Sequence, residues 1–130
     1  MKQQRPKKIS NKNMNKIKAL IYCRVATVRQ ERSGPGLDGQ EHSCRKYARD
    51  HDYEVEAVFK DSCSGISDPM QRPAMSALLK YSDKNPSGRY IVIFDGMGRL
   101  ARNVVFYQKL ITEFKIHGLV PECTNCSETK

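Results

Sequence analysis

Alternation between short apolar runs and stretches of helical spacing constrains the fold of this chain more than any other feature of its sequence. Residues 19–25 form an apolar run broken only by Arg24, and residues 90–94 form a second run bounded by glycine-containing turns. Continuous apolar runs of this length are typical of strands that are covered on both faces. The sequence further predicts strands over residues 54–59 and 119–123, and helices over about 38–51, from Pro73 onward and over about 103–117.

Strands that alternate with helices in this way predict an α/β fold, with a mostly parallel sheet of about four to five strands and helices on both faces. Asp38 is the expected cap of the first helix, and Gly118 is expected to end the last one. Residues 60–71 are too polar and too rich in turn formers for regular structure, so we expect a mobile surface loop there. In such sheets, ligand chemistry collects beyond the carboxyl ends of the strands.

The charge balance points to a polyanionic partner. Twenty-three Lys and Arg residues against fourteen Asp and Glu residues give the 130-residue chain a formal net charge of +9. Residues 1–18 hold seven of the basic residues and no acid, and nine minus seven leaves +2 for the remainder. We expect residues 1–18 to be a basic, disordered arm that contacts phosphates without reading sequence, 19–126 to be one folded domain and 127–130 to be a tail.

The chain is expected to be a cytoplasmic protein with reduced thiols. It has no apolar run of about eighteen residues, so no membrane span is predicted, and no apolar core long enough for a signal peptide. Its five cysteines are odd in number and irregular in spacing, which favours thiols over a disulfide framework. Cys123 and Cys126 have the spacing of half a zinc site or of a redox pair. Zinc would need a second close pair, so we interpret them as incidental thiols.

Arginines collect at the expected carboxyl edge of the sheet. Arg24 closes the first predicted strand, Arg99 and Arg102 follow the strand at 90–94, and Arg72 ends the predicted loop. A single arginine in such a place is most often a surface residue with a loose partner, whereas four that converge indicate an anion site. A phosphodiester under attack gathers negative charge on its non-bridging oxygens, and the planar guanidinium fork matches those oxygens in a bidentate way.

Acids and histidines do not show the spacing of a two-metal site. Asp61, Asp68 and Asp95 lie in predicted loops and share no motif. The sequence therefore favours an arginine-based phosphoryl transfer site without a metal.

Three separated motifs fall on the predicted elements. The first is Tyr22-Cys23-Arg24-Val25-Ala26-Thr27 followed by Gln30, the second is Asp61 with Ser64-Gly65 and Arg72-Pro73, and the third is Arg99-Leu100-Ala101-Arg102-Asn103. Together and in this order, they make residues 19–123 resemble the catalytic domain of the serine recombinases, the resolvase/invertase family. In that family the first motif supplies an arginine, a nucleophilic serine and a supporting glutamine.

This resemblance implies site-specific DNA recombination, as in the integration, excision or inversion of mobile elements. In the family, the serine attacks the scissile phosphate, forms a 5′-phosphoserine link and releases a 3′-hydroxyl, within a tetramer on two paired DNA sites and without an external cofactor. The catalytic residues implied here are position 26 as the nucleophile position, with Gln30, Asp61 and the arginines Arg24, Arg72, Arg99 and Arg102, which would also contact the DNA.

Two departures from the family bear on activity. Ala26 stands at the serine position, and its methyl group can neither be deprotonated nor form a phosphoester, so we expect no cleavage; the adjacent Thr27 points elsewhere and is not expected to replace it. The chain ends at Lys130, where the family continues into a dimerisation helix and a DNA-binding domain. We therefore expect that region to be absent and the chain to be a monomer or weak dimer. Gly98 is a minor departure, because the family usually has Asp there.

Two functions of different class remain open. The first is a recombinase catalytic domain that Ala26 has made inactive. The second is a non-catalytic DNA- or partner-binding regulator that keeps the fold and uses its arginines and basic arm to hold phosphate. An unrelated flavodoxin-like or nucleotide-binding domain is disfavoured, because no glycine-rich phosphate loop directly follows the first predicted strand.

Overall fold

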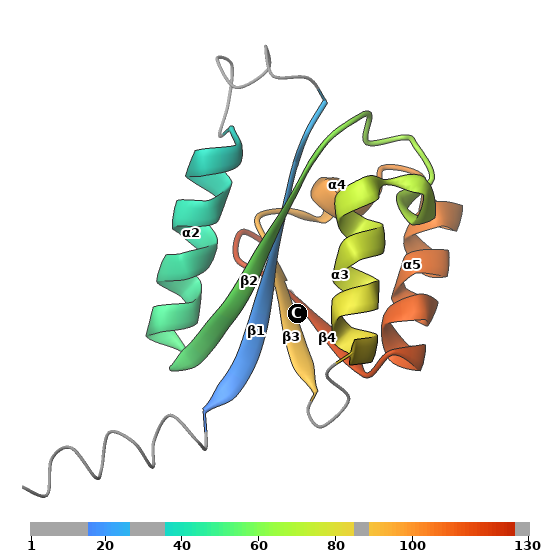
Figure 1. Cartoon of the computed structure of the whole chain (residues 1–130). Coiled ribbons are helices and arrows are strands. Elements are labelled where there is room, and N and C mark those ends of the chain that lie inside the picture. The colour runs from blue at the N-terminus through green and yellow to red at the C-terminus, as the bar shows by residue number, and fades with distance from the viewer. Residues whose placement is uncertain (1–15, 27–35, 85–88, 127–130) are drawn as a thin grey trace, which may run out of the picture.

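The computed structural model describes residues 16–26, 36–84 and 89–126 of the chain. In sequence order the chain runs through β1 (Ile17–Val25), α2 (Leu37–Asp50), β2 (Tyr53–Ser62), the 3₁₀ turn η2 (Pro69–Gln71), α3 (Pro73–Lys84), β3 (Tyr90–Phe94), α4 (Met97–Leu100), α5 (Val104–Ile116) and β4 (Leu119–Cys123) (Figure 1). Most of the predicted basic arm and the predicted tail at 127–130 lie outside the described residues. The arm was predicted to extend two residues too far, because Ile17 and Lys18 belong to β1, where they pair with residues of β2.

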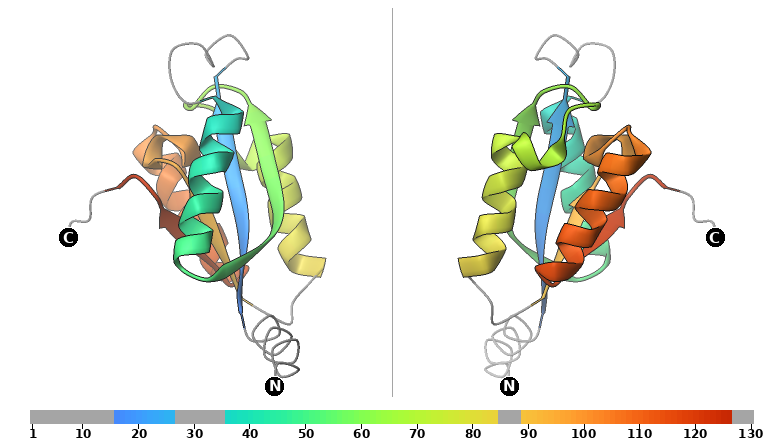
Figure 2. Two further views of the ribbon diagram at one scale, coloured as in Figure 1. Left: turned by 90° about the vertical axis from the view of Figure 1, so that its left-hand side faces the viewer. Right: turned by 90° about the vertical axis from the view of Figure 1, so that its right-hand side faces the viewer.

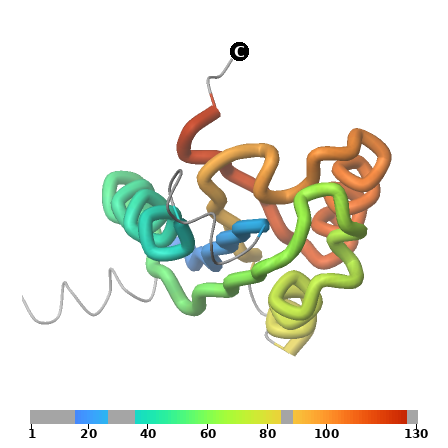
Figure 3. Tube along the Cα trace, turned by 90° about the horizontal axis from the view of Figure 1, so that it is seen from above, coloured from blue at the N-terminus to red at the C-terminus, as the bar shows by residue number. Residues whose placement is uncertain are grey.

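The strands form one sheet of order β2-β1-β3-β4, in which every neighbouring pair is parallel. Helix α2 covers one face, and α3 and α5 cover the other (Figures 1 and 3). This arrangement confirms the predicted α/β fold with a parallel sheet and helices on both faces. Because all strands run in the same direction, their carboxyl ends lie at one edge of the sheet, where the loops that carry the arginines begin.

Strand β1 is covered on both faces, as its apolar sequence predicts. Its side chains alternate between two cores: Leu20 and Tyr22 pack under α3 and α5, whereas Ala19, Ile21 and Cys23 pack under α2. The same alternation brings the next residue, Arg24, to the side of α3 and α4.

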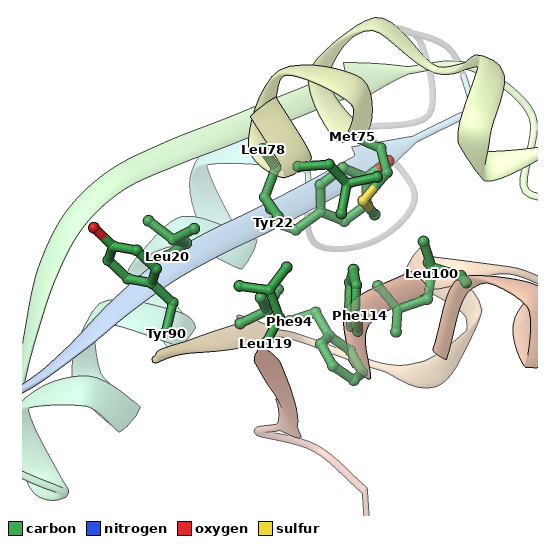
Figure 4. Close-up of a cluster of buried hydrophobic side chains, with 12 residues drawn as sticks. Leu20, Tyr22, Met75, Leu78, Tyr90, Phe94, Leu100, Phe114 and Leu119 are labelled. Atoms are coloured by element: carbon green, nitrogen blue, oxygen red, sulfur yellow. The ribbon is translucent and has the colours of Figure 1, made fainter. Parts of the chain in front are cut away.

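The larger core lies between the sheet and helices α3 and α5 (Figure 4). Helix α5 contributes Leu110 and Phe114, both with no exposed surface, and they meet side chains from three strands and from α3 and α4. The labelled members of this core are Leu20, Tyr22, Met75, Leu78, Tyr90, Phe94, Leu100, Phe114 and Leu119. This packing fixes the two helices that frame the arginine loops.

Helix ends show which local signals act. Pro73 begins α3, as predicted, and the Asn103 side chain accepts a hydrogen bond from the Phe106 N–H at 3.0 Å at the start of α5. Gly118 follows α5 with φ of 73°, a left-handed conformation that favours glycine.

The predicted cap of α2 was wrong. Gly36 occupies that position and Asp38 lies inside the first turn, where its charge still favours the helix dipole.

Two parts of the predicted loop at 60–71 are regular, so that prediction was too broad. Strand β2 continues to Ser62 because Lys60, Asp61 and Ser62 pair with residues of β1, and Pro69 begins the short turn η2. The Asp68 side chain caps η2 by accepting a hydrogen bond from the Met70 N–H at 3.0 Å. Sequence composition missed the strand extension because these polar residues are held by backbone pairing rather than by apolar burial.

The prediction that the cysteines are incidental thiols was wrong for one pair. Cys123 and Cys126 are joined by a disulfide, while Cys23, Cys44 and Cys63 are free. The chain turns directly after β4, and this brings the two Cα atoms to 5.5 Å, within the range that a disulfide spans. The irregular spacing of the five cysteines could not show a turn at this point.

No helix in the described part of the chain is long and apolar enough to cross a membrane.

Phe114→Ala should lower the free energy of unfolding by about 3–5 kcal/mol, because it leaves a cavity in the larger core. Val105→Ala is the matched control on the same helix, since Val105 is 68% exposed, and it should change stability by no more than about 0.5 kcal/mol. Urea denaturation followed by circular dichroism measures both. Equal effects of the two substitutions would contradict the packing described for α5.

Candidate functional site

Three segments meet at the carboxyl edge of the sheet: the end of β1, the loop after β2 and the turn after β3 (Figure 3). Backbone hydrogen bonds join them. The Cys63 N–H donates to the Val25 carbonyl at 2.8 Å, and the Arg102 N–H donates to the Gly65 carbonyl at 3.0 Å. The segments that carry the separated motifs are therefore in direct contact.

Arg24 lies under this contact with only 2% of its surface exposed. Its Nε donates to the Arg99 carbonyl at 3.1 Å, Nη1 to the Cys63 carbonyl at 2.8 Å and Nη2 to the Gly98 carbonyl at 3.0 Å. Burial lowers the pKa of Arg24, and the nearby positive charge of Arg72 lowers it further. One guanidinium thus binds both neighbouring loops.

Arg72 is 1% exposed, and protein groups take up its donors. Its Nη1 donates to the carbonyls of Arg99 at 3.1 Å and Leu100 at 2.8 Å and to the Tyr22 hydroxyl at 3.2 Å. Its Nε donates to Ser67 Oγ at 3.1 Å, and Nη2 donates to the carbonyls of Gly65 and Ser67. Arg72 is therefore a buried brace in this structure.

Gly98, Arg99 and Leu100 are the last residues of the one-turn helix α4. Because no further helical turn follows, no backbone N–H of the helix donates to their carbonyls. Arg24 and Arg72 supply the missing donors, and Arg99 alone accepts from both. A cation at the carbonyl end of a helix is also favoured electrostatically.

Asp61 holds the base of α3 and does not face the cavity. It is 3% exposed, and its carboxylate accepts the backbone N–H groups of Ala74 at 2.8 Å and Met75 at 3.0 Å. It also accepts from the Tyr22 hydroxyl at 2.8 Å. Burial raises the pKa of Tyr22, and the charge of Asp61 raises it further. Asp61 and Arg72 are thus linked through a neutral Tyr22.

Arg99 and Arg102 lie closer to solvent. The Arg99 Nη1 donates to the Arg24 carbonyl at 3.2 Å, and its Nη2 lies 3.9 Å from Asp95. The Arg102 side chain is exposed, and within the described residues its guanidinium has no hydrogen bond or ion pair. Arg102 is the arginine most available to a ligand.

A cavity of about 280 Å³ opens between these groups, lined by Arg24, Asp95, Gly96, Gly98, Arg99, Arg102 and Asn125. We call it the arginine pocket. Three arginines minus one aspartate give its lining a formal charge of +2. Within the described part of the chain, neither Arg24 nor Arg72 lies in an ion pair with a carboxylate. The pocket therefore favours an anion with several oxygens, such as a phosphate.

Ala26 follows directly after β1 and is half-buried. It lies two residues after Arg24, which lines the cavity, but Ala26 itself is not one of the lining residues. Thr27 and Gln30 lie outside the described residues. The structure thus brings the four predicted arginines together, but only Arg24, Arg99 and Arg102 line the pocket, while Arg72 and Asp61 support it from below.

Gln40 is a site residue that sequence reasoning missed. It is fully buried, and its side chain exchanges two hydrogen bonds of 3.0 Å with the backbone N–H and carbonyl of Arg24. The available signal was its spacing, because Gln40, Cys44 and Ala48 follow one another at four-residue intervals on the buried face of α2. Gln40 fixes the backbone from which the Arg24 side chain projects.

Position 65 requires a glycine because two arginine side chains approach its backbone closely. A Cβ atom at this position would lie 2.7 Å from Arg24 Nη2 and 3.0 Å from Arg102 Cδ. Arg24 cannot easily move away, because its guanidinium is held by three carbonyls. The Ser64-Gly65 motif therefore gives space to two arginines at once.

Among the described residues, no group of three or more His, Cys, Asp or Glu side chains is placed to hold a metal ion. The expectation of a metal-free, cofactor-free reaction stays a prediction.

The family model for the resolvase N-terminal domain matches residues 19–125 of the chain. Solved structures are similar as well. The N-terminal catalytic domain of TP901-1 integrase is 27% identical with a TM-score of 0.73, over 82% of this chain and 77% of that one. The C-terminal catalytic domain of ISC1926 TnpA, an IS607-like serine recombinase, is 27% identical with a TM-score of 0.70, over 86% and 73%.

A serine recombinase from Sulfolobus solfataricus is 26% identical with a TM-score of 0.56, over 84% of this chain and 71% of that one. No match was found among curated proteins.

Arg72→Lys should lower the free energy of unfolding by about 2–4 kcal/mol, because an ammonium has fewer donors and leaves buried carbonyls unpaired. Arg102→Lys is the matched control at an exposed arginine and should change stability by no more than about 0.5 kcal/mol. Urea denaturation of both variants tests this difference. If Arg72→Lys were as stable as the parent chain, the hydrogen bonds of the Arg72 guanidinium would not stabilise the fold.

Proposed function

The chain belongs to the family of resolvase N-terminal domains and carries the catalytic fold of a site-specific recombinase, and we propose that its arginine pocket holds a DNA phosphate without cleaving the strand. Members of this family act on DNA, and DNA is the polyanion that the net charge of +9 fits. The observation that carries the proposal is the arginine pocket itself, at the carboxyl edge of a parallel sheet and with a lining charge of +2.

The arginines would divide the work. Arg102 and Arg99 are the side chains nearest to solvent, and we assign them the direct contacts with the non-bridging phosphate oxygens. Arg24 would add its remaining N–H donors from the floor of the pocket. Arg72, Asp61 and Gln40 would act as positioning residues, because their polar atoms are used in holding Arg24, α3 and α4 in place.

Cleavage in this family needs a hydroxyl at position 26. Its oxygen would bond to phosphorus while the bond to the 3′-oxygen breaks, and the released oxygen would take up a proton. Ala26 has no oxygen to form that bond. We therefore assign this chain phosphate binding at a recombinase site and expect no covalent intermediate.

The second candidate function is a non-catalytic regulator of DNA or of a partner recombinase, and Ala26 is the observation that favours it. Such a protein would use the same pocket and would require no nucleophile. Recombinases of this family assemble as oligomers, and we propose that this chain forms at most a weak dimer by itself.

Arg102→Ala should weaken binding to duplex DNA several-fold and reduce the slope of log affinity against log salt by about 0.9, because one phosphate contact is lost. Arg49→Ala is the matched control: it removes the same charge from the exposed end of α2, at the amino edge of the sheet. Its slope should stay close to that of the parent chain. Fluorescence anisotropy at several salt concentrations measures both, and equal slopes for the two variants would contradict a phosphate site at Arg102.

Ala26→Ser should restore a nucleophile and give a covalent protein–DNA adduct that survives detergent and disappears after protease treatment. A pool of duplex DNA with randomised sequence serves as the substrate, since the target site is not specified by the pocket. Adding Arg99→Ala to Ala26→Ser should abolish the adduct while the fold is kept, as checked by circular dichroism. If Ala26→Ser forms no adduct and Arg102-dependent DNA binding persists, the pocket binds phosphate only and the regulator is favoured.

A further inference from the structure

The Cys123–Cys126 disulfide lies where β4 leaves the sheet, beside the arginine pocket, and neither the fold nor the proposed function requires it. Both cysteines are partly exposed. Two cysteines separated by two residues are the arrangement found in redox-active pairs. The bridge lies in the segment directly after β4, at the rim of the sheet (Figure 2), and because both cysteines are partly exposed a reactant from solution can reach it.

The two residues enclosed by the disulfide are both bound to one carboxylate. Thr124 Oγ1 donates to Asp95 Oδ1 at 3.3 Å, and Asn125 Nδ2 donates to the same oxygen at 3.1 Å. The Thr124 N–H also donates to the Phe94 carbonyl at 2.9 Å. The bridge therefore holds a turn whose side chains point to the end of β3.

Asp95 connects that turn to the arginine pocket. Its side chain is 4% exposed, and its other oxygen, Oδ2, lies 3.9 Å from Arg99 Nη2. Asp95 is the one acid in the lining of the pocket, and Asn125 lines the same cavity. The carboxylate thus lies between two amide or hydroxyl donors on one side and a phosphate-binding arginine on the other.

We propose that Cys123 and Cys126 form a redox site for a dithiol reductant, and that opening the disulfide weakens phosphate binding in the arginine pocket. The inference rests on the proposed function for the ligand of the pocket. It adds a site of covalent modification and a link from that site through Thr124, Asn125 and Asp95 to Arg99.

The reaction is a thiol–disulfide exchange. A thiolate of the dithiol attacks one cysteine sulfur, the Cys123–Cys126 bond breaks, and a mixed disulfide forms. The second thiolate of the reductant then displaces the protein sulfur and closes the reductant into its own disulfide. Two electrons and two protons pass from the dithiol to the protein, which ends with two thiols.

The effect on the pocket follows from competition for Asp95. While the bridge is closed, Thr124 and Asn125 are held as donors to Asp95, and their hydrogen bonds satisfy part of its charge. When the bridge opens, the turn gains conformational freedom and these donors are held less often. Asp95 then pairs more strongly with Arg99, and the pocket loses positive charge that a phosphate would otherwise meet.

The test is a titration of the full 130-residue chain with inorganic phosphate, followed by NMR through the backbone amides of Gly96 and Gly98 and the side-chain amide of Asn125. Phosphate should bind about fivefold more weakly in the presence of dithiothreitol than in its absence, at the lower end of typical coupling between two sites. Because coupling is reciprocal, saturating phosphate should make the disulfide harder to reduce by the same factor.

Variants separate the bridge from the other thiols. Cys123→Ser combined with Cys126→Ser should bind phosphate as weakly as the reduced chain and should not respond to dithiothreitol. Cys63→Ser is the control for the response to dithiothreitol, because Cys63, in the loop after β2, is the other partly exposed cysteine; its phosphate affinity is compared only with and without the reductant, since its carbonyl also holds Arg24. This control should keep the full response.

Each result decides between the two proposals. Equal phosphate affinity with and without dithiothreitol, while Arg102→Ala still weakens binding, would overturn the redox site and leave the phosphate pocket in place. Loss of the Arg102 effect would instead overturn the proposed function. Counting five reactive thiols in the unfolded chain after treatment with oxidised glutathione would show that the bridge does not form, and that result alone would also overturn the redox site.

Discussion

The hydrogen bonds from Arg24 and Arg72 to the carbonyls at the end of α4 are the interaction on which the rest of the site depends. A one-turn helix leaves its last carbonyls without partners, and burying them under a loop would be costly. Two guanidiniums solve this by donating to Gly98, Arg99 and Leu100 at distances of 2.8–3.1 Å. In turn the carbonyls make burial of two positive charges tolerable, so neither partner would be stable in this place without the other.

This arrangement explains why Arg72 and Arg102, which were both predicted as site residues, have different roles. The Arg72 guanidinium donates to protein groups, whereas the Arg102 guanidinium has no hydrogen bond or ion pair within the described residues and the residue is exposed. Asp95 offsets part of the charge of the pocket beside Arg99, but within the described residues neither Arg24 nor Arg72 is in an ion pair, so a ligand oxygen still meets net positive charge. Shape and charge of the pocket thus come from the same side chains, which links stability to ligand binding.

Much of the fold could be predicted from the sequence, because burial on both faces of β1 and β3 leaves apolar runs and because Pro73, Asn103 and Gly118 are local signals. The convergence of the four arginines was also predictable from the parallel sheet. Other features had no local signal. Helix α4 is a single turn stabilised from outside, Gln40 acts through a backbone 16 residues away, and the disulfide depends on a turn after β4. The different roles of Arg72 and Arg102 depend on how deeply each side chain is buried, which the spacing of residues in the sequence does not show.

Two departures from the family act in the same direction. By the resemblance described in the sequence analysis, Ala26 stands where the family would have the attacking serine, and Gly98 stands where it usually has an aspartate before the first arginine. A Cβ atom at position 98 would lie 3.7 Å from Arg102 Nε, so an aspartate there would stand within reach of that guanidinium. With glycine, Arg102 keeps its charge for a ligand, while the remaining acid, Asp95, lies beside Arg99 instead. Both observations fit the proposed function: Ala26 has no oxygen to bond to phosphorus, and the Arg102 guanidinium has no ion pair within the described residues, as holding a phosphate without cutting the strand would require.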